Sequence, residues 1–394
     1  MSLSLRASDS PSDSLARKMP IELNGADWSR LSDALSNAGS RVVSIVHIGD
    51  SHLQAETPTM RLRKKFQQKF GSGGRGLISP LKLSGTYQPS DYVISSTGSW
   101  SPAKFLRYPW PHTMGFSGTA LRPLQTETDL TISTEQEFDD VQIFHAGNVE
   151  ITNVTDGDGR HLDFVVEHSR DGWTAVTLDS PLTAVTIYLR PADDFILHCA
   201  MLTDGNPGVI YDVIGNGGSD MAMYNRVPAL GKGVSRLYPD LIILALGTND
   251  SYNNFSEERF ARTLDNLVKE LRSANPDAEF LLVTPMEIQY PRTITVKKQV
   301  RGRRGKLRTV NQKIKQRQVV KEIAPLRNII LDYAKRNNIA VYDWYAVTGG
   351  EGASRRWVDG GLMRTDHIHL TSAGYGLHAD MLFDAILDAL KMGD

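Results

Sequence analysis

Cysteine is almost absent from this chain of 394 residues, which contains one, Cys199. A single cysteine excludes an intrachain disulfide and a zinc site built from several thiolates. Its apolar surroundings, FILHCAML, predict a small buried residue. Long apolar runs are missing as well, because none approaches the roughly 20 residues that a membrane-spanning helix needs. The sequence therefore predicts no membrane span.

The chain also lacks an excess of charge of either sign. Its 44 lysine and arginine residues are balanced by 45 aspartate and glutamate residues. A net charge of −1 gives no overall attraction to nucleic acid or to an anionic membrane, and no nucleic-acid partner is expected. The hydrophobic content of 40% is typical of a globular protein, and the length suggests two domains.

The first 20 residues, MSLSLRASDSPSDSLARKMP, are polar and rich in serine. They lack the apolar core of a secretory signal peptide, and we interpret residues 1–20 as a flexible leader. A mature exported protein and a cytoplasmic protein would both begin in this way, so the start of the chain leaves the compartment open.

Five short and nearly continuous apolar runs predict buried parallel strands. The runs are Val42–Ile48, Gly208–Ile214, Leu241–Leu246, Phe280–Thr284 and Ile339–Trp344. Helical patterns follow most of them, at Glu56–Phe70, Ser256–Ala274, Asn311–Arg336 and Ser372–Met392. Strands that alternate with helices predict an open α/β sheet, formed by residues 21–83 and 205–394.

The segment 84–204 shows a different pattern, with short runs in which apolar and polar residues alternate. Val185, Ile187 and Leu189 form one such run, and Asp156–Gly159 (DGDG) has the composition of a hairpin turn. Several short strands separated by turns predict a β-sandwich-like domain inserted into the α/β domain.

Four short polar motifs follow the predicted strands or precede the last helix. They are Gly49-Asp50-Ser51, Gly217, Gly247-Thr-Asn249-Asp250 and Asp366-His-Ile-His369. Each motif alone is compatible with an ordinary turn. Ligands of open α/β sheets bind at the carboxyl ends of the strands, however, so we expect all four motifs to meet in one crevice.

The residue types in these motifs fit nucleophilic catalysis. A serine hydroxyl needs a base, and His369 with Asp366 three residues earlier can serve Ser51 as base and acid. The backbone N–H groups of Ser51 and Gly217 and the side-chain amide of Asn249 can stabilise an oxyanion. These residues predict nucleophilic catalysis by a serine, without a cofactor or metal. A metal pair at His367 and His369 is an alternative, but no third ligand of matching spacing is visible.

Taken in order, the four motifs resemble the conserved blocks of the SGNH/GDSL hydrolase family. The resemblance implies a flavodoxin-like three-layer α/β/α fold and ester hydrolysis through an acyl-serine. The string His47–His52 (HIGDSH) is similar to bacterial peptidoglycan O-acetylesterases, in which an inserted β domain resembles a carbohydrate-binding module. This second likeness implies an O-acetylated glycan as substrate and a periplasmic or secreted location. A lipase or thioesterase of the same fold, and a carbohydrate-binding or scaffolding protein without catalysis, remain alternatives.

Several other residues have two interpretations. Asp50 and His52 are expected to support the site, and His52 is more easily explained as structural than as a second base. Arg75, in the glycine-rich loop 71–76, is a candidate substrate contact at the rim. A sugar-stacking surface of Trp100, Trp110 and Trp173 competes with burial of these rings in the β core.

The run Lys297–Arg308 (KKQVRGRRGKLR) is strongly basic. Runs of like charge are usually solvated, so a loop before the next helix is the simpler interpretation. Contact with an anionic polymer, such as a cell-wall glycan, is the functional alternative. The sequence does not predict the acyl chain length, the identity of the glycan or the oligomeric state.

Overall fold

A computed structural model of the protein describes residues 15–54, 57–252, 254–301 and 306–393. Of the predicted leader, residues 1–20, the first 14 lie outside the described residues. From residue 15 on, the leader is packed rather than free. Leu15, Ala16 and Met19 contact the core, and the Arg17 N–H donates to the Val347 carbonyl at 2.8 Å.

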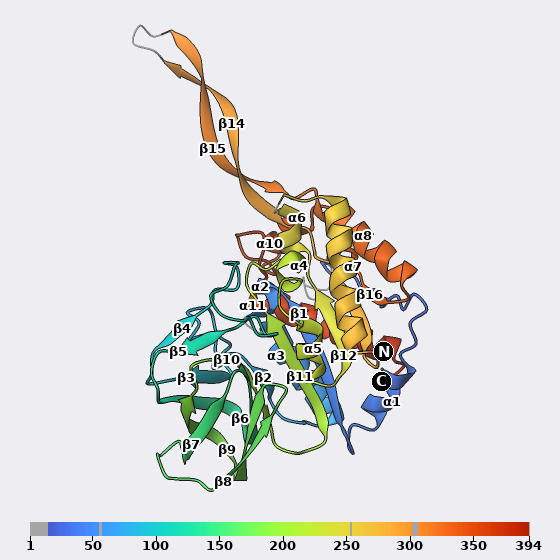
Figure 1. Ribbon diagram of the computed structural model, residues 1–394. Helices are drawn as coiled ribbons and strands as arrows, with labels where there is room; N and C mark the ends of the chain where they lie inside the picture. Colours follow the sequence, from blue (N-terminus) through green and yellow to red (C-terminus); the bar gives the residue numbers. More distant parts are fainter. Residues whose placement is uncertain (1–14, 55–56, 253, 302–305, 394) are drawn as a thin grey trace, which may run out of the picture.

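The central sheet has five parallel strands in the order β11-β1-β12-β13-β16 (Figure 1). The strands are β1 Val42–Gly49, β11 Gly208–Gly215, β12 Pro239–Ala245, β13 Glu279–Val283 and β16 Ala340–Tyr342. In chain order this arrangement is 2-1-3-4-5, which is the flavodoxin-like order. The five predicted strands and the predicted fold class are therefore confirmed.

Helices cover both faces of this sheet and make three layers. On one face lie α1 Ser29–Ser36, α3 Thr57–Phe70 and α11 Ser372–Ala389, whose apolar residues share one core cluster with the sheet. On the other lie α5 Leu230–Ser235, α7 Glu257–Ala274 and α8 Ile323–Arg336, which share a second cluster. Because both faces are buried, the strands read as continuous apolar runs. Among the described residues, no helix is both long and apolar enough to span a membrane.

Five short helices complete the α/β part. They are α2 Ser51–Gln54, α4 Met221–Tyr224, α6 Thr248–Tyr252, α9 Trp344–Val347 and α10 Ala353–Asp359. Two of them, α2 and α6, start immediately after β1 and β12 and so lie at the carboxyl edge of the sheet. α1 was not predicted, because its single short amphipathic face gives a weak sequence signal.

A second sheet of nine strands, mainly antiparallel, lies beside the first (Figure 1). Its strands are β2 Gly76–Ile78, β3 Tyr92–Ser95, β4 Trp100–Pro102, β5 Leu121–Pro123, β6 Thr128–Ala146, β7 Val149–Asp156, β8 Phe164–Ser169, β9 Trp173–Pro191 and β10 Ile196–Thr203. This sheet curls around its own apolar core. Its first strand, β2, precedes residue 84, so the β-rich region begins earlier than the sequence suggested.

The DGDG segment forms a turn, in which the Asp156 N–H donates to the Arg160 carbonyl at 2.9 Å. The strands on either side, β7 and β8, do not form a regular hairpin with each other. Both pair with β9, and only an isolated bridge joins Thr155 to His161. The predicted hairpin is therefore limited to the turn itself.

A long hairpin replaces the first half of a predicted helix. β14 Gln289–Arg301 and β15 Leu307–Val319 pair antiparallel along their whole length and project from the body, and we call them the arm (Figure 1). The predicted helix over 311–336 is thus wrong before Ile323, where α8 begins. The predicted loop over 297–308 is wrong for residues 297–301 and 307–308, which are strand. Residues 302–305 lie outside the described residues.

Candidate active site

The predicted nucleophile sits at the point where β1 gives way to helix α2. A side chain on Gly49 would place its Cβ 2.6 Å from the Leu53 Cδ1 atom and 2.9 Å from the Ala245 carbonyl oxygen. Only glycine therefore lets the chain turn so tightly from strand to helix. The turn exposes Ser51 at the carboxyl edge of the sheet, between the ends of β11 and β12.

Ser51, His369 and Asp366 are joined by a continuous chain of hydrogen bonds. The Ser51 Oγ and His369 Nε2 atoms are 3.0 Å apart, and the His369 Nδ1 and Asp366 Oδ2 atoms are 2.9 Å apart. The second oxygen of Asp366 accepts from the backbone N–H groups of Ile368 and His369, each at 2.9 Å. This is the geometry of a nucleophile, a base and the acid that orients the base.

The pKa of Asp366 lies below its ordinary value. Partial burial raises this pKa, but the hydrogen bonds from the His369 ring and from the two backbone N–H groups outweigh it. An ionised Asp366 holds the proton of His369 on Nδ1. The Nε2 atom is then free to accept the proton of the Ser51 hydroxyl.

The loop that carries the acid and the base is fixed from both sides. The Arg364 N–H donates to the His369 carbonyl at 2.8 Å, and the Gln289 N–H of the arm donates to the His367 carbonyl at 3.0 Å. Arg317, also on the arm, donates to the Asp366 carbonyl. His367 has a φ of +55°, which non-glycine residues rarely adopt, so the loop is bent sharply between its acid and its base.

Asn249, the predicted oxyanion donor, is buried at the start of α6. Its Nδ2 group donates to the Ser219 carbonyl at 2.9 Å and to Asp50 Oδ2 at 3.2 Å, while its Oδ1 atom accepts from the Tyr252 hydroxyl. Burial raises the pKa of Asp50 to about 6, although hydrogen bonding from the His52 N–H lowers it. The amide is thus held in one orientation by partners on three sides.

Gly217 also lies in the crevice, but its N–H group already has a partner. It donates to Gln54 Oε1 at 2.8 Å, and the Gln54 amide in turn donates to Thr86 and, at 3.3 Å, to the Tyr87 carbonyl. A Cβ at position 217 would lie 2.3 Å from the same Gln54 oxygen, so a larger residue there would displace the end of the Gln54 side chain. The side-chain oxygen of Gln54 therefore occupies the Gly217 N–H group, which the sequence analysis assigned to the oxyanion.

Two clefts meet at Gln54. The first, of about 250 Å³, is lined by Ser51, His52, Gln54, Thr57, Tyr87, Arg364, His369 and Tyr375. The second, of about 330 Å³, is lined by Gln54, Asn216, Gly217 and residues 81–119 of the neighbouring β-rich region, including Lys104 and Arg107. Because Gln54 lines both clefts, its side chain separates the nucleophile from the second cleft.

Sequence reasoning missed Gln54 and Tyr87. Gln54 follows Ser51 by three residues on the same helix, but its contacts with Gly217 and Thr86 depend on the tertiary fold. Tyr87 is 68% exposed and lines the cleft of the nucleophile, in a stretch that contains no recognisable motif.

His52 lies beside the base without joining the hydrogen-bond chain. Its Nδ1 atom is 3.0 Å from the Tyr375 hydroxyl oxygen, and its ring centroid is 5.4 Å from that of His369. Burial, followed by the nearby His369, lowers the pKa of His52 to about 3. The ring is therefore neutral at physiological pH and adds no positive charge beside His369.

The prediction that Arg75 contacts substrate is wrong. Arg75 is 1% exposed, its Nη2 atom lies 3.0 Å from Asp91 Oδ2, and its guanidinium stacks over the Tyr92 ring at 4.6 Å. A guanidinium is tolerated in the interior when it is paired, and Arg75 does not line the cleft that contains Ser51. The glycine-rich segment around it leads into β2 instead of forming a mobile loop at the rim.

The three candidate tryptophans are partly buried rather than displayed together. Trp110 stacks on Phe105 with a centroid distance of 5.8 Å, and its Nε1–H donates to the Phe105 carbonyl at 2.8 Å. Trp173 packs against the same core cluster, and Trp100 packs against the core of the curled sheet. These contacts favour the core interpretation of all three rings.

The alternative of a metal pair at His367 and His369 receives no support from the described residues. Within them, no group of three or more histidine, cysteine, aspartate or glutamate side chains is placed to hold an ion. The two ring nitrogens of His369 contact Ser51 and Asp366.

With the site in place, the chain can be compared with known proteins. A model of the GDSL-like lipase/acylhydrolase family matches residues 199–377, a range that includes Gly217, Asn249, Asp366 and His369. Ser51 lies outside this range, on the far side of the β-rich region, and the fold brings it back to the other motifs. A search of curated proteins found no match.

Among solved structures, the chain is similar to a peptidoglycan O-acetylesterase, with a TM-score of 0.71 and 19% identity over 94% of this chain and 99% of that one. A lipase/acylhydrolase from Enterococcus faecalis matches with a TM-score of 0.32 and 21% identity over 48% and 80%. The fold and the site define a flavodoxin-like ester hydrolase with a serine nucleophile motif. Over residues 199–377 the chain matches the GDSL-like lipase/acylhydrolase family, and it shares its fold with the O-acetylesterase.

Proposed function

We propose that the protein is a serine esterase that removes O-acyl groups, above all O-acetyl groups, from a carbohydrate polymer such as peptidoglycan. The observation that carries the proposal is the hydrogen-bond chain from Ser51 through His369 to Asp366 at the wall of an open cleft. The likeness to a peptidoglycan O-acetylesterase along nearly the whole of both chains supports this choice of substrate. Action on peptidoglycan would place the protein in the bacterial periplasm or outside the cell.

The reaction proceeds in two acyl transfers. His369 Nε2 takes the proton of Ser51 while Oγ attacks the acyl carbon, and the resulting imidazolium protonates the departing sugar oxygen. The sugar alcohol leaves, and the acyl group remains on Ser51 as an ester. His369 then takes a proton from water, whose oxygen attacks the acyl carbon, and the carboxylic acid leaves as Ser51 recovers its proton.

The oxyanion of each step needs donors that are already in place. The proposed donors are the Ser51 N–H, the Gly217 N–H and the Asn249 amide, whose two N–H bonds donate to the Ser219 carbonyl and to Asp50 in this structure. The Gly217 N–H becomes available when the Gln54 carbonyl moves away, so the substrate carbonyl oxygen replaces the Gln54 oxygen at this group. Substrate binding therefore exchanges one hydrogen bond for another of the same kind.

The lining of the cleft supports a short acyl group. The described lining residues are hydroxylic, imidazole, amide, guanidinium or phenolic, and none among them is aliphatic. A long acyl chain would have to pack along these polar groups, which costs free energy compared with an apolar channel. An acetyl group brings only one methyl group into contact with these polar groups, so this free-energy cost is small.

A panel of esters tests the proposal. Hydrolysis of p-nitrophenyl acetate, butyrate and octanoate is compared with acetate release from O-acetylated peptidoglycan, for the parental chain and for Ser51→Ala. We expect activity on acetate and on the polymer, and its loss in the variant. A preference for octanoate would support the lipase alternative, and the absence of all hydrolysis would support a non-catalytic carbohydrate-binding protein.

A further inference from the structure

The arm concentrates positive charge that the rest of the chain lacks. Residues 289–319 contain eleven of the 44 lysines and arginines and no aspartate or glutamate. The remaining residues hold 33 cationic and 45 acidic side chains, which gives them a net charge of −12. The near-neutral total therefore conceals a cationic arm on an acidic body.

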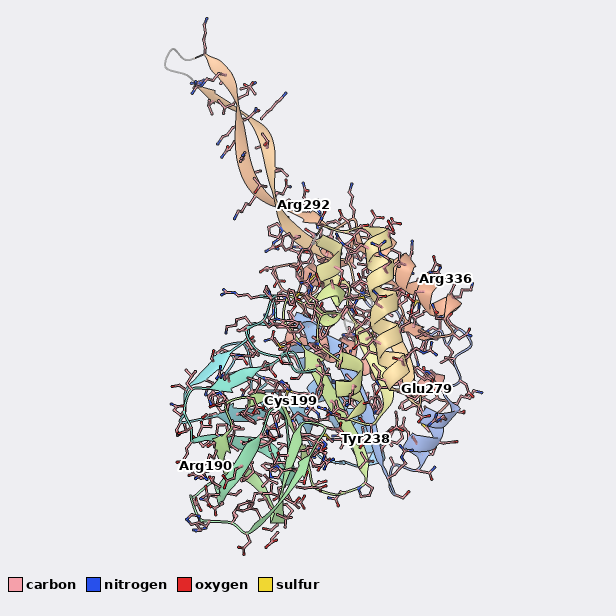
Figure 2. The ribbon with its side chains drawn as sticks, viewed as in Figure 1. Arg190, Cys199, Tyr238, Glu279, Arg292 and Arg336 are labelled. Atoms are coloured by element: carbon pink, nitrogen blue, oxygen red, sulfur yellow. The ribbon has the colours of Figure 1, made fainter. Side chains whose placement is uncertain are left out.

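Most of the arm's charges have no ion-pair partner among the residues that the structure describes. Of the nine cationic side chains that the structure describes there, Arg292 lies 3.6 Å from Glu322 and Arg317 donates to the Asp366 carbonyl. The other seven are exposed and form no ion pair with any described residue. They are Lys297, Lys298, Arg301, Lys306, Arg308, Lys313 and Lys315. Figure 2 shows side chains with nitrogen tips extending from both strands of the arm.

The pairing of the strands sorts the arm into two faces. Ile294 pairs with Ile314, and with Val296, Val300 and Val310 they form a half-buried aliphatic stripe on one face. The opposite face carries threonines, amides and cations, which we call the polar face. Its central members are Thr293, Thr295, Lys297, Gln299, Thr309, Asn311, Lys313, Lys315 and Arg317. Successive residues on one face of a strand are roughly 7 Å apart, so the polar face presents cations and hydrogen-bonding groups in regular rows.

The polar face begins at the catalytic loop. Arg317 belongs to this face and donates to the carbonyl oxygen of Asp366, while the Gln289 N–H donates to that of His367. At the same end, Tyr290 stacks on Tyr252 with a centroid distance of 4.4 Å, and the Tyr252 hydroxyl donates to Asn249. A polymer lying along the polar face would therefore reach the protein where the base and the oxyanion donor lie.

We infer that the arm binds a carboxylate-bearing glycan along its polar face and so delivers an acidic, O-acylated polysaccharide to Ser51. The inference rests on the proposed function and specifies its substrate. Hydroxyl, amide and cationic groups together match a polyhydroxylated polyanion. A bilayer would need an exposed apolar face with aromatic or leucine anchors, which the central part of the aliphatic stripe does not supply. Thirteen residue pairs extend the arm by roughly 40 Å, several times the Debye length of about 8 Å, so the acidic body does not cancel its charge.

Binding is tested in the full chain carrying Ser51→Ala, so that no substrate is turned over. The variant K297Q/K313Q/K315Q removes three charges from the polar face. The control K64Q/R170Q/K335Q removes three exposed charges from the body. We expect the arm variant to bind polygalacturonate and purified peptidoglycan about tenfold or more weakly at low salt, and the dependence of log affinity on log salt to fall by about 2. The control should change affinity less than twofold.

Turnover gives a second readout. In the chain with Ser51 intact, the ratio of kcat/KM on O-acetylated polygalacturonate to that on O-acetylated dextran should fall about tenfold in the arm variant, because dextran is neutral. Equal effects of the arm and control variants would overturn the inference. Tighter binding to phosphatidylglycerol vesicles or to duplex DNA than to the acidic glycan would also overturn it.

The two proposals fail separately. If Ser51→Ala hydrolyses esters at the parental rate, the proposed function is wrong whatever the arm binds. If ester hydrolysis depends on Ser51 but the arm and control variants bind glycan equally, only the inference about the arm is wrong.

Discussion

The catalytic crevice and the arm are stabilised in opposite ways, although they touch. Asp50 and Asn249, in the crevice, are almost fully buried and hydrogen-bonded to groups from distant parts of the chain. The arm is a two-stranded ladder with exposed charges and a half-buried stripe, and such hairpins are marginal on their own. The proposed chemistry, which depends on fixed distances, would thus lie in the buried crevice, and the proposed recognition of an extended glycan would lie on the exposed arm.

The largest effect on activity should come from a substitution in the catalytic crevice. Ser51→Ala removes the proposed nucleophile, so we expect hydrolysis of p-nitrophenyl acetate to fall by a factor on the order of 10³ or more. Ser40→Ala, at an exposed position, serves as the control. A serine-reactive phosphonate should label Ser51 alone, and labelling of another serine would contradict the assignment.

Asn249→Ala should lower kcat by roughly 10²–10³ and leave KM nearly unchanged, because the amide acts on charge that develops in the transition state. Steady-state kinetics on the same ester measures both parameters. A change confined to KM would instead place Asn249 in ground-state binding. Since Tyr252 also holds the amide, Tyr252→Phe should give a smaller loss in kcat.

A substitution of Gln54 should have a smaller effect, and it should raise kcat/KM instead of lowering it. Gln54→Ala frees the Gly217 N–H, and an intramolecular hydrogen bond is worth about 0.5–1.5 kcal/mol, so kcat/KM for a small ester should rise about two- to tenfold. Gln54→Glu is the matched variant. Its carboxylate would repel the oxyanion and should lower kcat. A loss of activity in the alanine variant would mean that Gln54 shapes the cleft and does not compete with the substrate.

The smallest effect concerns the response of stability to pH. Burial, and then the nearby His52, lowers the pKa of His378 to about 3, against about 6.5 in an unfolded chain. The unfolded state therefore binds more protons between pH 3 and 6.5, so His378 makes stability fall as the pH drops through this range. Asp50 and Asp250, whose pKa values burial raises to about 6 and about 7, act in the opposite direction.

His378→Phe keeps the stacking on Trp344 and removes an imidazole whose Nε2 atom is buried without a hydrogen-bond partner among the described residues. The loss of unfolding free energy between pH 7 and pH 5 should become smaller by about 1–2 kcal/mol. Thermal or urea unfolding at the two pH values measures it. An unchanged difference would show that His378 is protonated in the folded state.

The strands of the central sheet could be predicted because helices bury them on both faces. A strand covered on both faces must be apolar throughout, and the polar residues that follow it are then conspicuous, as at Gly49–Ser51 and Gly247–Asp250. The family model matches residues 199–377, from the last strand of the β-rich region onward, so the link between Ser51 and the later motifs rests on the fold. Catalytic roles for these residues stay predictions until the variants are measured.

The arm and Gln54 could not be predicted for different reasons. Lysine, glutamine and arginine favour helices, and they outnumber the alternating Val310 and Ile314 that carry the strand signal in β15. Arg75 was misjudged because its partner Asp91 is separated from it by 16 residues with no pattern to connect them. The position of Gln54 opposite Gly217 spans 163 residues, and only the folded chain brings the two together.

The separation of Ser51 from His369 by 318 residues also has a consequence in time. At a synthesis rate of about 5–20 residues per second, Ser51 leaves the ribosome roughly 15–60 s before His369 does. Until residues 366–369 have been synthesised and folded, Ser51 lacks the base proposed for it and is an ordinary hydroxyl. The order of the chain thus delays the assembly of this hydrogen-bond chain to the last stage of synthesis.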